Sequence, residues 1–368
     1  MKVIMIEYFL PTNTYSIELC RELSKYCDLT LICKDNYKLE SDVTYKILPI
    51  LHSTASNKIY GFCEYLRDLL KIRKVIKKER PNVLHIQGIV HLSLETLFYK
   101  LIKKYTDIVC YTVHNVLSHE TKKSEAKYLK YFYSLCDIFC IHNNHSKELF
   151  EQKNNIEKNI YVIPHGCYED YMDRPELKKD KDKIVFLEFG LIRKYKGIDI
   201  LLEAISKLPK YVLDNSKFVI AGNQKAKYDS FDYIEYSKKL GIYEYIDFEI
   251  RYIKDEEIEG LFSNSDCCLF PYRNIYGSGA LLMAYTFEKP VITSDIPSFR
   301  EETAEGETGI LFKSEESEGL KEAIIEFYNL TSEERINLSK KVKRIKENKY
   351  NWKNSALMIA DAYKRNLK

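Results

Sequence analysis

Apolar runs of four to eight residues recur along the chain, and the segments between them carry apolar residues at helical spacing. In the first half the pattern predicts strands at 2–8, 28–33, 44–50, 82–86, 108–114, 137–142 and 160–163. It predicts helices between them at 14–26, 60–80, 93–104, 123–135 and 144–153. Strands that alternate with helices are typical of βαβ units and a parallel sheet.

The pattern restarts after a polar segment, 166–182, which contains Pro175. Strands are predicted at 183–189, 217–221, 246–249, 267–270, 290–293 and 310–312, with helices at 197–208, 229–240, 255–264, 278–287 and 316–329. Two further helices, 332–347 and 352–366, close the chain. We therefore expect two tandem doubly wound, Rossmann-like α/β domains: residues 1–167, joined by the closing helix 352–368, and residues 183–351, with a linker at 168–182. Ligands of such sheets bind at the carboxyl ends of the strands, so a cleft between two facing sheets is the expected site.

Composition narrows the class of protein. With 368 residues, 45% hydrophobic and 30% charged, the chain is globular, and disorder is excluded. A net charge of +3 gives no reason to expect a nucleic-acid partner. The ten cysteines form no C-x-x-C pair, which indicates reduced, buried thiols and no metal site. The first residues read as a short strand rather than a signal peptide, and no run of about 18 apolar residues occurs, so we expect a cytoplasmic protein.

Two asymmetries separate the halves of the chain. Residues 58–130 carry a formal net charge of +8, which leaves a net charge of −5 for the rest of the chain. All eight histidines fall within the first 165 residues: His52, His85, His91, His114, His119, His142, His145 and His165. The two halves are chemically unlike.

A basic loop follows the first strand of the second half. The strand ends at Gly190, and Gly197 opens an amphipathic helix. Arg193 and Lys196, which lie between these glycines, are expected to project from the carboxyl edge of the sheet. There they could bind a diphosphate, the arginine through two parallel N–H groups and the lysine through its positive charge. A solvated basic loop is the alternative. Neither G-x-G-x-x-G nor G-x-x-x-x-G-K-[ST] occurs, which argues against a dinucleotide dehydrogenase and a P-loop NTPase.

A second anion site is predicted where Gly277-Ser278-Gly279-Ala280 opens an apolar helix. Helix N-termini present bare backbone N–H groups, and Ser278 could cap the helix and donate to a phosphate oxygen. The alternative is an ordinary capped helix.

In the first half, His114 ends an apolar strand where the chain would open to the cleft, whereas His85, His91 and His142 are interpreted as hydrogen-bonded core histidines.

Taken in order, these segments resemble the GT-B nucleotide-sugar glycosyltransferases of the retaining family-4 type. The series comprises Ile163-Pro-His-Gly166, Lys196-Gly197, Val219-Ile-Ala-Gly222, Asp266-Cys-Cys-Leu-Phe-Pro271, Lys289-Pro-Val-Ile-Thr-Ser-Asp295, Glu301 and Thr308-Gly-Ile-Leu-Phe312. The resemblance implies a terminal helix, here with Trp352 and Tyr363, that crosses back to the first domain.

The resemblance also implies roles for particular residues. Lys196 would hold the donor diphosphate, Arg193 would replace the family's Arg, whose place Leu191 takes, and His114 would orient or stabilise the transferred sugar. The family's paired glutamates would fall near Ile275 and Met283, neither of which is acidic. Ser278-Gly279 fits a variant turn at this place. The donor-binding set expected here is Gly190, Arg251, Tyr252, Tyr272, Gly277, Ser278, Gly279 and Ala280, with Arg251 and Tyr252 beside the base. The acceptor-side set is Thr12, Asn13, Asn115, His119 and His165.

The implied activity is transfer of a sugar from a nucleotide-diphosphate sugar to a glycan or lipid-diphosphate-linked acceptor, without cofactor or metal. The basic stretch 58–130 would let the acceptor domain rest on anionic lipid at the inner face of the cell membrane, or its lysines are simply solvated. Two alternatives stay open at this point. One is a GT-B-fold nucleotide-sugar epimerase, and the other is a degenerate, non-catalytic nucleotide-sugar binding protein.

Overall fold

The structure is a computed structural model that describes residues 1–10, 15–37, 43–52, 58–114, 116, 123–156, 159–168 and 183–367. The chain forms two units. The N-terminal unit comprises Met1–Gly166 and Asn351–Lys368, and the C-terminal unit comprises Cys167–Tyr350. The closing helix therefore belongs to the N-terminal unit, as expected.

The N-terminal unit holds a parallel sheet in the order β3-β2-β1-β4-β5-β6-β7. Its strands are β1 (Lys2–Ile6), β2 (Asp28–Lys34), β3 (Lys46–Leu51), β4 (Val83–Ile86), β5 (Ile108–Val113), β6 (Ile138–Ile141) and β7 (Asn159–Val162). Its helices are α1 (Tyr15–Leu23), α2 (Lys58–Glu79), α3 (Leu92–Ile102), α4 (Lys123–Leu135), α5 (Asn144–Asn154) and α14 (Trp352–Asn366). The inner strands β1, β2, β4, β5 and β6 are buried on both faces, which is why they read as continuous apolar runs.

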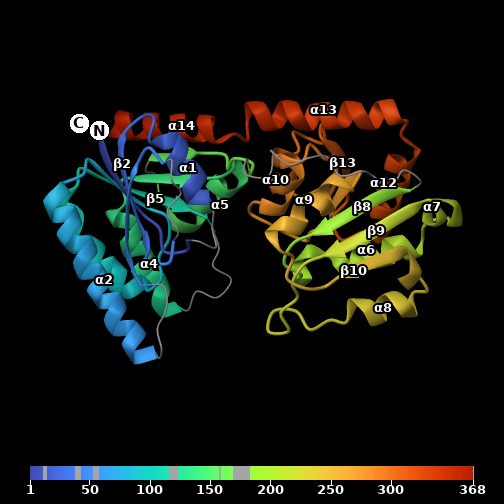
Figure 1. The fold of residues 1–368 in the computed structure, drawn as a ribbon, viewed down its shortest axis with the longest axis horizontal. Helices are drawn as coiled ribbons and strands as arrows, with labels where there is room; N and C mark the ends of the chain where they lie inside the picture. Colours follow the sequence, from blue (N-terminus) through green and yellow to red (C-terminus); the bar gives the residue numbers. More distant parts are fainter. Residues whose placement is uncertain are drawn as a thin grey trace. The chain divides into compact units, whose positions relative to one another are not determined.

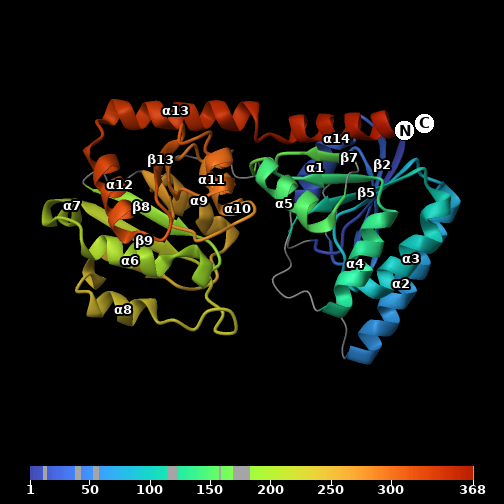
Figure 2. The same ribbon diagram turned by 180° about the vertical axis from the view of Figure 1, so that it is seen from behind.

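Helices α1 and α14 lie side by side on one face of this sheet, and α2, α3 and α4 are grouped on the other (Figures 1 and 2). The core under α1 and α14 takes Trp352, Ile359 and Tyr363 from the closing helix. It is contiguous with Tyr15 and Leu19 of α1 and with alternate residues of the central strands. The C-terminal helix is thus part of the packing that holds the N-terminal sheet.

The C-terminal unit holds a second parallel sheet in the order β10-β9-β8-β11-β12-β13. Its strands are β8 (Ile184–Phe189), β9 (Ser216–Ala221), β10 (Ile246–Glu249), β11 (Cys267–Phe270), β12 (Val291–Ser294) and β13 (Gly309–Phe312). Its helices are α6 (Ile198–Ser206), α7 (Lys210–Asp214), α8 (Tyr233–Lys239), α9 (Asp255–Ser263), α10 (Gly279–Thr286), α11 (Pro297–Glu302), α12 (Ser317–Asn329) and α13 (Ser332–Asn348).

The predicted fold class is confirmed, with differences confined to short elements. The sequence pattern missed α7 and α11, which have five and six residues and so too few turns to show a helical period. The helix predicted at 229–240 begins only at Tyr233, because the side chain of Asp232 caps it by accepting from the backbone N–H of Glu235. Part of the predicted linker, 169–182, lies outside the described residues.

Candidate functional site

The loop after β8 is shaped by two glycines with positive φ. Gly190 has φ +127° and Gly197 has φ +68°. A Cβ at Gly190 would lie 2.5 Å from the Lys196 ammonium nitrogen, and one at Gly197 would lie 2.0 Å from the carbonyl oxygen of Pro271. Glycine is required at both places because the backbone there is left-handed and closely approached. The loop therefore folds back over the strand end and brings Lys196 with it.

Lys196 differs from its expected position. The side chain turns inward instead of projecting from the sheet, and only 4% of the residue is exposed. Its ammonium donates to the carbonyl oxygen of Phe189 at 3.1 Å and lies 4.8 Å from the centre of the Tyr272 ring. Because one hydrogen bond uses one of three N–H groups, the ammonium retains capacity to donate to an anion at this strand end.

A buried carboxylate that the sequence analysis did not single out lies beside this ammonium. Glu188, in β8, is fully buried, and its Oε1 is 3.6 Å from Lys196 Nζ. Neither of its carboxylate oxygens has a hydrogen-bond partner among the residues that the structure describes. Burial raises the pKa of Glu188 to about 7 against the opposing effect of Lys196. The sequence does carry a signal for this buried carboxylate, because Glu188 is the one charged residue within the apolar run Val185–Phe189.

The start of α10 lies against the same place. Ser278 caps the helix, since its Oγ accepts from the backbone N–H of Leu281 at 3.2 Å. A Cβ built on Gly190 would be 3.7 Å from the Cβ of Ala280, so the helix N-terminus and the Lys196 loop are neighbours. The cluster of Gly190, Lys196, Tyr272, Ser278 and Ala280 is called the donor cluster below.

A second buried carboxylate supports the donor cluster from behind. Glu302, at the end of α11, accepts from the backbone N–H of Ser278, and its Oε2 has no hydrogen-bond partner among the residues that the structure describes. Burial raises the pKa of Glu302 to about 8. Ile275 and Met283, where the family's glutamates would fall, are a loop residue and a buried core residue of α10. The carboxylates of this region thus come from β8 and α11.

Two arginines are placed differently from one another. Arg193 stacks on the Tyr228 ring, with 4.3 Å from its guanidinium carbon to the ring centre. Arg273, which the sequence analysis did not single out, forms a fork with Asp199 at 2.8 and 3.0 Å and donates to the carbonyl oxygen of Lys194 at 2.7 Å. Arg273 therefore braces the basic loop, because it ties the loop to the first turn of α6.

Arg251 and Tyr252 follow β10. Arg251 is paired with Glu249 at 2.9 Å and with Glu257 at 2.6 Å, while Tyr252 is 68% exposed. Arg251 lines a hollow of about 430 Å³ with these two glutamates. Gly277 and Gly279 are exposed at the start of α10.

In the N-terminal unit, a chain of side-chain hydrogen bonds crosses the carboxyl edge of the sheet. His142 Nδ1 is 3.1 Å from the carbonyl oxygen of Ile163, and His142 Nε2 is 3.2 Å from His114 Nδ1. His114 Nε2 is 3.2 Å from the side-chain oxygen Oε1 of Gln87. Burial, together with the neighbouring histidines, lowers the pKa of His114 well below its ordinary value.

This chain holds the His114 ring in place. A carbonyl oxygen only accepts, so His142 donates from Nδ1 to Ile163, and His114 donates from Nε2 to Gln87 Oε1. The remaining ring nitrogens, His142 Nε2 and His114 Nδ1, face each other at 3.2 Å. Both ring nitrogens are engaged, and the arrangement suits an orienting role rather than that of a general base.

An aromatic cluster surrounds these histidines. Tyr15 packs edge-on against His114 at 5.0 Å and lies 4.9 Å from His165, between ring centres. Trp352 lies 5.1 Å from Tyr15 and 5.0 Å from His165. His165 Nδ1 approaches the carbonyl oxygen of Gly166 at 2.6 Å. Of the expected acceptor-side residues, Thr12, Asn13, Asn115 and His119 lie outside the described residues.

One group of potential metal ligands occurs in the part of the N-terminal unit that the structure describes. His85, Cys110 and Cys140 are fully buried, and their ligand atoms lie within 4.8 Å of one another. Both ring nitrogens of His85 are already bonded, Nδ1 to the Tyr363 hydroxyl at 2.5 Å and Nε2 to Thr112 Oγ1 at 2.7 Å. We therefore interpret these three residues as part of the packed core and not as a metal site.

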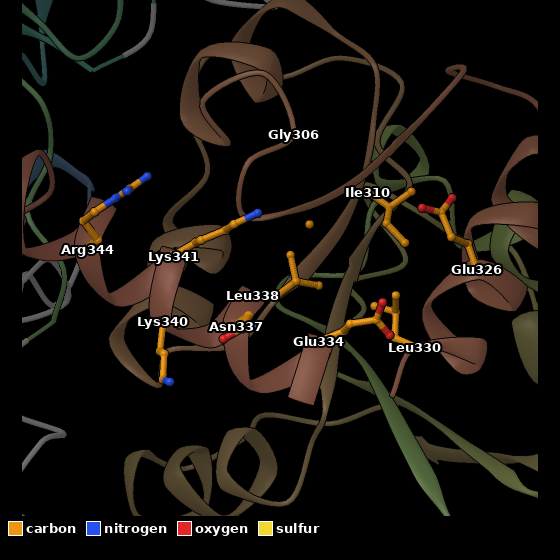
Figure 3. A pocket seen from close by; sticks show the side chains of 11 residues that line it. Gly306, Ile310, Glu326, Leu330, Glu334, Asn337, Leu338, Lys340, Lys341 and Arg344 are labelled. Carbon is orange, nitrogen blue, oxygen red and sulfur yellow. The ribbon is translucent and has the colours of Figure 1, made fainter. Parts of the chain in front are cut away.

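A groove of about 700 Å³ lies elsewhere in the C-terminal unit. It runs between β13 and α13, beside Gly309 at the first residue of β13, with Glu326 and Glu334 towards one end and Lys341 and Arg344 towards the other (Figure 3). The donor cluster is at the carboxyl ends of β8 and β11 instead. A hollow at the opening residue of a strand is not where a doubly wound sheet binds its ligand.

The comparisons with known proteins agree with this architecture. Residues 171–352 match the family model described as "Glycosyl transferases group 1", and residues 12–170 match the model described as "Glycosyltransferase Family 4". An uncharacterized 41.2 kDa protein in the cps region of Klebsiella pneumoniae is 27% identical over 278 residues, which is 71% of this chain and 74% of that protein.

Solved structures share the fold over nearly the whole chain. Anabaena HepE in complex with UDP and glucose has a TM-score of 0.74 at 13% identity and covers 99% of this chain and 100% of its own. A glycosyltransferase from Rickettsia africae has a TM-score of 0.73 at 17% identity, covering 100% and 98%. WaaG, a glycosyltransferase involved in lipopolysaccharide biosynthesis, has a TM-score of 0.66 at 14% identity, covering 98% of each chain.

Proposed function

The chain belongs to the group 1 glycosyltransferases of the GT-B fold, and we propose that it moves a sugar from a nucleotide-diphosphate sugar to a glycan or lipid-linked glycan in the biosynthesis of a cell-surface polysaccharide or glycoconjugate. The observation that carries the proposal is the match of two glycosyltransferase models to consecutive stretches, 12–170 and 171–352. The relative in a cps region supports the polysaccharide context. The family models favour transfer over the epimerase and the non-catalytic binding protein.

For the donor, we propose that the diphosphate lies at the donor cluster. Glycosyl transfer builds negative charge on the leaving diphosphate, so the main catalytic task is to stabilise that charge. The Lys196 ammonium and the first backbone N–H groups of α10 can do this with fixed dipoles and one cation, and they need no metal ion. Arg193 would join them from its stacked position on Tyr228. Retention of configuration is part of this proposal and rests on the family alone.

In the N-terminal unit, we propose that His114 orients the transferred sugar and that the acceptor binds near His165. The support is the hydrogen-bond chain that fixes the His114 ring, the packing of Tyr15 against that ring, and the packing of Trp352 on Tyr15 and His165. A neutral ring held at both nitrogens is rigid, which favours positioning over proton transfer.

Donor turnover tests the activity. The full chain is incubated with a panel of UDP- and GDP-sugars, with and without a lipid-linked or free glycan fraction, and nucleoside diphosphate is measured. We expect release that requires the acceptor fraction. Conversion of the donor to an epimer, or tight binding of donor with no release under any condition, would contradict transfer.

We further propose that the N-terminal unit rests on anionic lipid through α2, α3 and α4. No described helix is long and apolar enough to cross a bilayer. Exposed apolar residues stand four apart on α2 and α3: Phe62, Leu66 and Leu70, with 48%, 37% and 64% exposure, and Leu97 and Leu101, with 52% and 58%. Exposed lysines and arginines accompany them on α2, α3 and α4 and directly after α2 and α3, namely Lys71, Arg73, Lys74, Lys77, Lys78, Arg80, Lys100, Lys104, Lys127 and Lys130. Apolar side chains within a basic surface are typical of interfacial binding.

Sedimentation with liposomes tests this surface. We expect the chain to sediment with phosphatidylserine-containing vesicles at low salt, less at physiological salt, and not with neutral vesicles. The double variant Lys74→Glu/Lys78→Glu should bind at least about tenfold more weakly, since each basic residue near the surface contributes about 1 kcal/mol. The matched control Lys340→Glu/Lys341→Glu changes the same charge on α13 and should bind like the unmodified chain. Equal losses in both variants, or no binding at either salt, would contradict the proposal.

A further inference from the structure

Glu188 is an unusual residue to find inside a donor-binding sheet. It is the penultimate residue of β8, where the side chains on either side of it along the strand, Leu187 and Phe189, belong to the apolar core. It is fully buried, and neither carboxylate oxygen receives a hydrogen bond from any described residue. A buried carboxylate without donors is unfavourable unless a cation compensates it or it binds a proton.

One cation is available to compensate it. Lys196 Nζ lies 3.6 Å from Glu188 Oε1 and is itself only 4% exposed. The Phe189 carbonyl oxygen accepts from the same ammonium. Tyr272, on the loop after β11, lies under the ammonium and is affected by the Glu188 charge, and Tyr195 packs edge-on against Tyr272 at 5.9 Å between ring centres. The charge of Glu302, from α11, also acts on Tyr272. The partner of Glu188 is therefore the lysine that we assign to the donor diphosphate.

We propose that Glu188 is a positioning residue that competes with the donor diphosphate for the Lys196 ammonium, so that binding of the nucleotide sugar is coupled to protonation of Glu188. The inference rests on the proposed role of Lys196. When the ammonium turns to the diphosphate, an ionised Glu188 would be left buried without a counter-charge. The carboxylate then takes one proton from the buffer, and the Glu188 O–H bond is the only bond formed.

The direction of the pH dependence follows. Burial raises the pKa of Glu188 to about 7, which places its titration near neutral pH. Below this value the carboxyl is already neutral, and Lys196 presents its whole charge to the donor. Above it, the donor must first draw the ammonium away from a carboxylate. Affinity for the donor should therefore fall as the pH rises from 6 to 8, by about fivefold if binding raises the pKa by one unit.

Titration calorimetry in buffers of different ionisation enthalpy measures the coupled proton directly. UDP-glucose and GDP-mannose are the probes, because both diphosphates are diesters that do not titrate between pH 6 and 8, unlike free UDP or GDP. For the full chain we expect net proton uptake on binding at pH 7.5, little uptake at pH 5.5, and a dissociation constant that rises with pH. In Glu188→Gln, which keeps the shape of the side chain, uptake and pH dependence should both disappear.

Two comparisons keep the result specific. Glu302→Gln removes the other buried carboxyl with a raised pKa, and loss of the proton uptake in that variant but not in Glu188→Gln would overturn the inference. If Lys196→Ala leaves donor affinity unchanged, the proposed donor site itself is wrong. If Lys196→Ala weakens binding but Glu188→Gln keeps the wild-type pH dependence, only the inference fails.

A readout without donor completes the test. A carboxyl whose pKa is raised by folding loses stabilisation as the pH rises from its unfolded to its folded pKa. The melting temperature of Glu188→Gln relative to the unmodified chain should therefore be higher at pH 8 than at pH 5. A difference that does not change with pH would contradict a titrating, buried Glu188.

Discussion

Replacing Lys196 with alanine is expected to weaken binding of the nucleotide sugar by about 10- to 150-fold, because a hydrogen bond to a charged group contributes about 1.5–3 kcal/mol. The ammonium is held at the donor cluster by the Phe189 carbonyl, the Tyr272 ring and Glu188. Its loss removes the one buried cation that the described residues place at the end of β8. Calorimetric titration with UDP- and GDP-sugars measures the change.

The chain offers a matched control in the same short turn. Lys194 is two residues away and exposed, and it contributes its backbone carbonyl, not its side chain, to the contact with Arg273. Lys194→Ala should bind the donor within about twofold of the unmodified chain, as expected for an exposed charge. Lys196→Arg keeps the charge and should recover part of the affinity. Equal losses in Lys194→Ala and Lys196→Ala would show that only the general charge of the loop matters.

Replacing Trp352 with alanine should destabilise the N-terminal unit by about 3–5 kcal/mol, the usual cost of truncating a large buried aromatic residue. Trp352 is 1% exposed at the first turn of α14 and packs on Tyr15 and His165. A Cβ on Gly166 would lie 2.5 Å from the indole, so the Trp352 ring packs directly on the backbone of this glycine. Removing it opens a cavity under α14 that a glycine cannot fill.

Circular dichroism during urea unfolding measures this change, since Trp352 is the one tryptophan of the chain and its fluorescence is lost in the variant. Leu357→Ala, at a 41% exposed position of the same helix, is the control and should cost less than about 1 kcal/mol. We expect an earlier transition in Trp352→Ala only. A variant as stable as the control would mean that the closing helix does not hold the N-terminal sheet.

The alternation of strands and helices was readable from the sequence because parallel strands covered on both faces must be apolar along their whole length. The positions of Gly190 and Gly197 also marked a loop at a strand end. The direction of Lys196 was not readable, because it depends on the positive φ of Gly190 and on the buried charge of Glu188. A pattern of residue types does not show which way a long side chain turns.

The histidines illustrate the same limit. His85 lies in β4, His114 and His142 directly follow β5 and β6, and His165 lies three residues after β7. These four strands are neighbours in the sheet, so the histidines stand in a row. The sequence identified His114 as a strand-end residue and His142 as a core residue. The contact between the two became visible only with the strand order, and with it the fixed orientation of the His114 ring.

Hydrogen–deuterium exchange with and without nucleotide sugar tests the central claim most directly, namely that the C-terminal unit of a glycosyltransferase holds the donor at the ends of β8 and β11. With a saturating UDP- or GDP-sugar, we predict slower exchange in peptides covering 189–199 and 277–284, the Lys196 loop and the start of α10. Protection should weaken in Lys196→Ala at the same donor concentration. Unchanged exchange in both segments, with protection around the groove at 306–344 instead, would contradict the account.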